Sequence, residues 1–120
     1  MQPDNPLINW TWKSDKICLK FTFIGMLEIE DAISAVEKWK KAFSSRPSDK
    51  IVLIWECHHM TGYDTESRLL WQKTLKELKP QIDSIWLITT SRLIRMGAQI
   101  MTLFTSINTE IVETEDQIVF

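Results

Sequence analysis

The chain has 120 residues, of which 44% are hydrophobic and 25% charged, as expected of one globular domain. Its 14 Lys and Arg against 16 Asp and Glu leave a net charge of −2, which excludes the strongly basic surface of a typical nucleic-acid-binding domain. Two cysteines are too few for a disulfide scaffold, and no apolar run reaches the roughly 20 residues that a membrane helix needs. The start of the chain lacks a signal-peptide pattern, so we expect a cytoplasmic location.

The first third of the chain predicts a polar arm, a hairpin and a helix. Residues 1–6 are polar and contain two prolines, which favours a loosely held arm. Apolar and polar residues alternate over 8–13 and again over 17–23, as in two antiparallel strands, and Gly25 is expected to end the second. From residue 28 the apolar spacing becomes helical, with one stripe formed by Ile29, Ala32, Ile33, Val36, Trp39 and Phe43.

The middle of the chain predicts two central strands separated by a helix. Residues 51–55 and 85–88 are apolar on both faces of an extended chain, which is typical of strands inside a parallel sheet. A helix is expected over 64–79, with Asp64 or Thr65 as its N-cap. We expect core packing as the default for all six tryptophans of the chain.

The last third predicts a helix, a short strand and a helical stub. The helix is expected over 92–107, and its apolar residues cover about half of its circumference. Because this stripe is wider than one sheet face covers, we expect Met96, Leu103 and Ile107 to form a partner or ligand surface. A short strand is expected over 110–112, followed by a capping box and a stub of helix.

This order, β-β-α-β-α-β-α-β, predicts one α/β domain over residues 7–120 with a mixed sheet of four or five strands. We expect the helices to pack mainly on one face of the sheet. The other face would then need a cover, for which the N-terminal hairpin, the N-terminal arm and a second subunit are the candidates.

One polar segment, 56–64, holds both histidines and a cysteine between a buried strand and a helix. Cys57, His58 and His59 could supply metal ligands or a thiol nucleophile with a histidine base. Their spacing fits a metal site poorly, and an oxyanion-hole motif and glycine-rich phosphate loops are both missing. We therefore rank an enzyme or metal protein last and expect no metal or other cofactor.

The element order over residues 7–118 resembles a STAS domain, the fold of anti-anti-sigma factors and SpoIIAA-like proteins. The most specific stretch is the hydrophobic strand 51–56 running into residues 61–67, where family members have a short loop and an Asp-Ser-Ser/Thr-Gly motif. The resemblance implies a single α/β regulatory domain, closest to the SpoIIAA-like (STAS/SEC14-type) branch.

This sequence matches the family motif only in part. Asp64 matches its aspartate and Thr65 its first hydroxyl residue, whereas Glu66 stands at the usual phospho-acceptor and Ser67 at the glycine. A kinase partner cannot phosphorylate a carboxylate, although the carboxylate can imitate the charged state. The resemblance thus implies a binding site at the loop and helix start without the family's phosphorylation switch.

Taken together, we expect a non-enzymatic regulatory or protein-interaction module. It would bind an unidentified protein partner through residues 64–67 and the third helix, and it would also form a homodimer. The alternative is the binding of a small apolar or amphipathic ligand between the sheet and the helices. Nucleic acid is not an expected partner.

Overall fold

The computed structural model describes residues 4–120, and its five strands form one mixed sheet in the order β1-β2-β3-β4-β5. β1 runs antiparallel to β2, and every other neighbouring pair is parallel. The predicted element order and α/β class are confirmed. The strands are β1 (Leu7–Lys13), β2 (Lys16–Leu27), β3 (Ile51–Tyr63), β4 (Ile82–Ile88) and β5 (Thr109–Val112).

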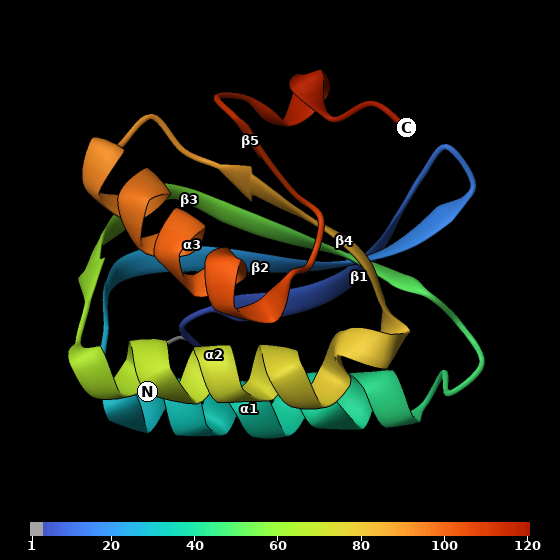
Figure 1. The fold of residues 1–120 in the computed structure, drawn as a ribbon, viewed down its shortest axis with the longest axis horizontal. Helices are drawn as coiled ribbons and strands as arrows, with labels where there is room; N and C mark the ends of the chain where they lie inside the picture. The colour runs from blue at the N-terminus through green and yellow to red at the C-terminus, as the bar shows by residue number, and fades with distance from the viewer. Residues whose placement is uncertain (1–3) are drawn as a thin grey trace.

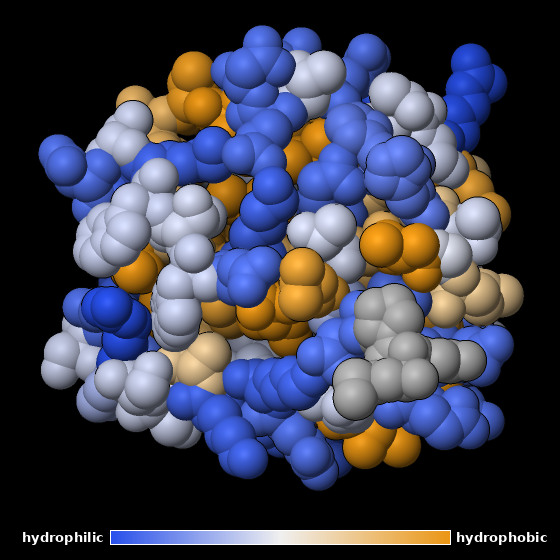
Figure 2. Space-filling model, turned by 180° about the vertical axis from the view of Figure 1, so that it is seen from behind, coloured by the Kyte–Doolittle hydropathy of each residue, from blue (hydrophilic) through white to orange (hydrophobic). Residues whose placement is uncertain are grey.

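The three α-helices are α1 (Ile29–Ser44), α2 (Thr65–Leu78) and α3 (Arg92–Thr105). All three pack on one face of the sheet, with α1 and α2 side by side and α3 further along the chain in front of the strands (Figure 1). Seen from behind the view of Figure 1, the molecule presents mainly hydrophilic side chains with smaller, separate hydrophobic areas (Figure 2). Within residues 4–120, none of the helices is long and apolar enough to cross a membrane.

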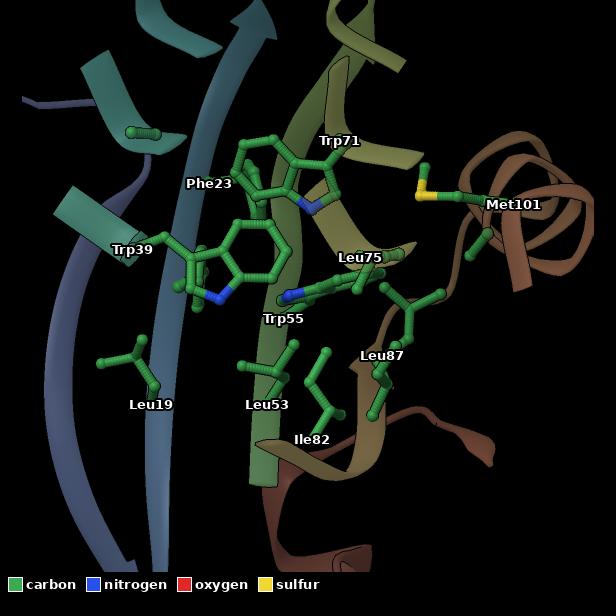
Figure 3. Packing of buried hydrophobic residues seen from close by; sticks show 14 of the residues in the cluster. Leu19, Phe23, Trp39, Leu53, Trp55, Trp71, Leu75, Ile82, Leu87 and Met101 are labelled. Carbon is green, nitrogen blue, oxygen red and sulfur yellow. The ribbon is translucent and has the colours of Figure 1, made fainter. Parts of the chain in front are cut away.

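An aromatic cluster fills the core between the helices and the sheet. Trp39 of α1 is fully buried, and its ring centroid lies 5.2 Å from that of Phe21 and 5.1 Å from that of Trp71. The ring centroid of Trp55, on β3, lies 6.4 Å from that of Trp71 (Figure 3). Edge-to-face pairs such as Trp39–Phe21 and Trp55–Trp71 add to the gain from burying the rings.

The prediction that all six tryptophans are buried is wrong for two of them. Trp10 and Trp12 are 36% and 60% exposed on β1, the edge strand of the sheet. The Arg46 guanidinium lies 5.2 Å and 5.9 Å from their ring centroids. A cation packed over the aromatic faces takes the place of core packing at this exposed edge.

The second face of the sheet is covered by the end of the chain, residues 113–120, which we call the C-terminal segment. Ile118 packs against this face, and the Phe120 ring meets Trp86 edge-on at 5.6 Å. Glu115 forms ion pairs with Lys13 and Lys20, at 2.8 Å and 2.6 Å. Of the candidates named from the sequence, neither the hairpin nor residues 4–6 of the arm provide this cover. The buried residues beneath it are Cys18, Val52, Ile54, Trp86 and Ile88.

The predicted capping box of the C-terminal segment is confirmed. It opens the 3-10 helix η2 (Glu115–Gln117), with hydrogen bonds in both directions between Thr114 and Gln117. The box turns the chain back over the sheet immediately after β5, which positions Ile118 on the second face.

Two strand boundaries differ from the prediction. β2 does not end at Gly25, which has φ +69° at a bulge that lets the strand continue to Leu27. β3 continues to Tyr63, although residues 56–63 were predicted as a loop, because the extended β2 pairs with them as far as Leu27↔Tyr63. β4 pairs with β3 only up to Glu56, so the second half of β3 is a two-stranded extension with polar, exposed positions.

Helix boundaries agree closely, with local corrections. Ile33, placed on the core stripe of α1 from the sequence, is 50% exposed because it lies at the edge of that stripe. α2 ends at Leu78, two residues before Pro80, which lies in the 3-10 helix η1 (Lys79–Gln81). Residues 1–3 of the predicted arm lie outside the described residues, whereas Asn5 is hydrogen-bonded to β2 through Ile24 and Met26.

Candidate functional site

Asp64 joins the starts of two helices. One carboxylate oxygen accepts a hydrogen bond from the Ser67 N–H at 2.8 Å and so caps α2, as predicted. The other accepts from the Ile29 N–H at 3.0 Å, at the first residue of α1. Because Glu28 gives α1 no side-chain cap, the distant Asp64 takes over that role.

The protonation of Asp64 reflects these contacts. The neighbouring Ser67 hydroxyl and N–H, and the Ile29 N–H, hold the pKa of the Asp64 carboxyl below its usual value because they stabilise the charged form. The Ser67 hydroxyl is buried and lies beside the carboxylate without the alignment of a well-formed hydrogen bond. The carboxylate is therefore ionised at neutral pH and committed to backbone donors.

The four residues predicted as a binding site thus divide into two pairs. Asp64 and Ser67 hold the helix starts together, and Ser67 is fully buried. Thr65 and Glu66, in the first turn of α2, are exposed. A partner can reach only the second pair directly, while the first pair determines where that turn lies.

Replacing Asp64 with alanine is expected to lower the urea midpoint at pH 7, because two helix starts lose one shared acceptor. Thr65→Ala, one residue further in the exposed turn, is the matched control and should change the midpoint little. The unfolded-state pKa of an aspartate is about 3.9, and the folded-state pKa of Asp64 is lower. The carboxylate therefore stabilises the fold above about pH 4, and this contribution is lost as the pH falls through the folded-state pKa.

The wild-type midpoint should consequently approach that of Asp64→Ala as the pH is lowered from neutral to about 3. Equilibrium urea unfolding at several pH values checks this. A difference between the two proteins that stays constant over the whole range would contradict the role of the ionised carboxylate.

Cys57, His58 and His59 do not form a nucleophile–base pair. Cys57 is buried on the helix side of β3, and burial raises the pKa of its thiol far above the usual range. His58 is bound elsewhere: its ring contacts the Glu56 carboxylate and the Glu113 carbonyl oxygen, the latter at 2.6 Å. In the part of the chain that the structure describes, no cluster of three or more His, Cys, Asp or Glu side chains could hold a metal ion.

The outward side of α3 carries a row of exposed large apolar side chains. We call this row the α3 apolar face; it consists of Leu93, Met96, Ile100, Leu103 and Phe104. Leu103 is 80% exposed, and Met96 is 57% exposed, as expected of a surface site. Ile107, the third residue predicted there, is only 8% exposed: α3 ends at Thr105, and the chain then turns Ile107 into the core. The predicted surface therefore keeps Met96 and Leu103 and loses Ile107.

A small apolar cavity lies between α2, α3 and the second half of β3. Its volume is about 50 Å³, and it is partly open to the surface. The aromatic residues Trp55 and Trp71 form part of its wall, and Met101 of α3 reaches toward them (Figure 3). The other lining residues are Phe23, Leu27, Cys57, Met60, Tyr63, Ser67, Arg68, Leu87, Ile94, Gly97 and Ala98.

The sequence held one signal for this cavity that was not used. Gly97 lies in the middle of α3, where glycine is unfavourable unless another group approaches closely. The Tyr63 hydroxyl occupies that space, because a Cβ on Gly97 would lie only 1.9 Å from it. Tyr63 and Gly97 thus fix the distance between α3 and the end of β3. Arg68 gave no such signal, since its position on the wall depends on how α2 packs.

Comparison with solved structures shows what kind of fold carries this site. The chain is similar to an uncharacterised protein of the DUF3478 family with a SpoIIAA-like fold from Shewanella loihica PV-4, with a TM-score of 0.79 and 16% identity over 97% of this chain and 92% of that one. It is also similar to the anti-sigma factor antagonist SpoIIAA in its unphosphorylated form, with a TM-score of 0.66 and 13% identity over 92% of each chain. No family model and no curated protein matches the sequence.

These similarities establish the fold. The chain is a mixed α/β domain with a SpoIIAA-like, STAS-type fold, which confirms the resemblance seen in the sequence. Identities of 16% and 13% carry no residue roles from these proteins to this chain.

Proposed function

We propose that this chain is a non-enzymatic protein-recognition module of the STAS type that associates with a second copy of itself through the α3 apolar face. The observation that carries the proposal is the gathering of five exposed large apolar side chains on one helix. Soluble monomers rarely expose a contiguous apolar patch of this kind without using it.

The composition of α3 favours a protein surface as the occupant. Met96 and Phe104 are of the types enriched in interfaces, and α3 has no acidic residue from Arg92 to Thr105. A symmetric pair would place the same apolar row of each copy against the other, which requires no second complementary surface. The exposed Thr65 and Glu66 would remain available for regulation by another partner.

We further propose that recognition is not switched by phosphorylation at residue 66. The motif of the family that this sequence resembles has its phospho-acceptor where Glu66 stands. Glu66 carries a permanent negative charge next to the start of α2, where a negative charge is favourable. The negative charge at this position would therefore be constant and not controlled by a kinase.

Sedimentation velocity tests the proposal with two variants of α3. Leu103→Lys places a charge at the most exposed residue of the apolar row and is expected to yield monomers, whereas the wild type is expected to sediment as a dimer. Gln99→Lys adds the same charge to an exposed polar position of the same helix and should leave the dimer intact. Both substitutions are at the surface, so each should change the free energy of unfolding by no more than about 0.5 kcal/mol.

Two results would overturn the proposed association. One is that the wild type and Leu103→Lys both sediment as monomers at every concentration tested. The other is an equal loss of dimer in Leu103→Lys and Gln99→Lys, since this would indicate a general effect of charge and not of the apolar row.

A further inference from the structure

The cavity between α2, α3 and β3 has one charged residue at its wall. Of the described residues that line it, only Arg68 carries a charge at neutral pH. Arg68 is partly buried and belongs to a wall that is almost wholly apolar, which indicates that its aliphatic stem lines the cavity; the length of the side chain lets the guanidinium reach the opening. Among residues 4–120, the ion pairs formed by Asp and Glu side chains leave Arg68 without a partner.

The rest of the wall is apolar and adaptable. Trp55 and Trp71 offer flat aromatic surfaces, and Met60 and Met101 have flexible side chains that adjust to a ligand. A wall of this kind does not hold water, so an apolar group can enter it without displacing an ordered solvent molecule. An apolar pocket with a single cation at its edge matches a ligand with an apolar tail and one negative charge.

We propose that this cavity binds a monocarboxylate with a short apolar tail, the tail lying against Trp55 and Trp71 and the carboxylate pairing with Arg68. The guanidinium presents parallel N–H donors that fit the two oxygens of a carboxylate. This inference does not rest on the proposed association of α3. The cavity lies beneath α3, whereas the proposed association uses the exposed side of that helix.

The size of the cavity limits the tail. An apolar cavity of about 150 Å³ accommodates benzene, whereas the volume here is about 50 Å³. The last few carbons of the tail can therefore be held inside the cavity, and the carbons next to the carboxylate would lie nearer the opening. Short-chain carboxylates are the class that fits, and bulky or polycyclic acids do not.

The test compares three probes that share one tail: hexanoate, 1-hexanol and hexylamine. Binding is measured at neutral pH by tryptophan fluorescence and by the methyl NMR signals of Met60 and Met101, which locate the ligand. We expect hexanoate to bind about three- to tenfold more tightly than 1-hexanol, as expected of one partly exposed charge-assisted pair. Hexylamine should bind most weakly, because its charge is repelled by Arg68.

Two arginine variants separate the role of Arg68 from general charge. Arg68→Gln should reduce hexanoate binding to the level of 1-hexanol and leave 1-hexanol binding unchanged. Arg95→Gln removes an exposed arginine on α3 that does not line the cavity and should leave all three affinities unchanged. Equal binding of hexanoate and 1-hexanol to the wild type, shifts that bypass both methionines, or equal effects of the two variants would each overturn the proposal.

Discussion

Trp39→Ala is expected to lower the free energy of unfolding by about 3–5 kcal/mol, the cost typical of truncating a buried aromatic residue. Trp39 is fully buried in α1 and meets Phe21, Phe43 and Trp71 in edge-on or tilted contacts. The substitution removes the side chain that joins α1 to both β2 and α2. Because Trp39 contacts aromatic rings of β2 and α2 as well as one of its own helix, its removal leaves a cavity bounded by three elements.

Urea unfolding of Trp39→Ala and of Trp12→Ala provides the comparison. Trp12 is 60% exposed and contacts the Arg46 guanidinium at the edge of the sheet, so its removal should cost at most about 1 kcal/mol. Both variants lose one indole, which keeps the change in composition the same. Similar losses of stability in the two would contradict the central role of the aromatic cluster.

Local patterns in the sequence were sufficient for the helices and their starts. Asp64 was predicted as a cap, and Ser91 is of a residue type that commonly caps a helix; each accepts a hydrogen bond from the backbone of its own helix. These contacts join residues three positions apart, so the sequence contains everything that they need. The same holds for the Thr114–Gln117 capping box.

Contacts between distant segments were not predictable in this way. The second bond of Asp64 reaches Ile29, 35 residues earlier, and depends on how α1 and α2 pack side by side. The continuation of β3 beyond Trp55 depends on a bulge at Gly25 in another strand. Residues 56–63 have the polar composition of a loop, and only pairing with β2 makes them a strand.

The candidate site illustrates the same limit. The exposure of Met96 and Leu103 followed from the width of the apolar stripe on α3, which is a property of one helix. Ile107 continues that stripe in the sequence but follows the end of the helix, at Ser106 with φ +58°. The left-handed turn sends Ile107 inward, and nothing in the apolar spacing marked that turn.

Removing residues 114–120 is expected to open the second face of the sheet. Five buried residues of β2, β3 and β4 lie beneath that segment, and Cys18 among them has no exposed surface. The truncated chain should bind a hydrophobic dye and associate nonspecifically, because contiguous apolar surface becomes exposed. Its free energy of unfolding should also fall, since the ion pairs of Glu115 with Lys13 and Lys20 are lost together with the apolar contacts.

The reactivity of the two cysteine thiols shows which face of the sheet the truncation exposes. In the full chain, burial raises the pKa of Cys18 and that of Cys57, so neither thiol should react readily with a soluble disulfide reagent at neutral pH. Truncation should make one thiol reactive, and Cys18→Ala in the truncated chain should remove that reactivity. Cys57 should stay unreactive because it lies on the helix side of the sheet.

A pair of full-length variants distinguishes apolar cover from chain length. Replacing Ile118 and Phe120 together with serine removes the contacts to the second face and should reproduce the reactivity of Cys18. Val119→Ser alters the residue between them, which is 72% exposed, and should leave the thiol protected. If Cys18 stayed protected after truncation, the second face would have to be covered by association with another chain, and the C-terminal segment would not be what keeps it buried.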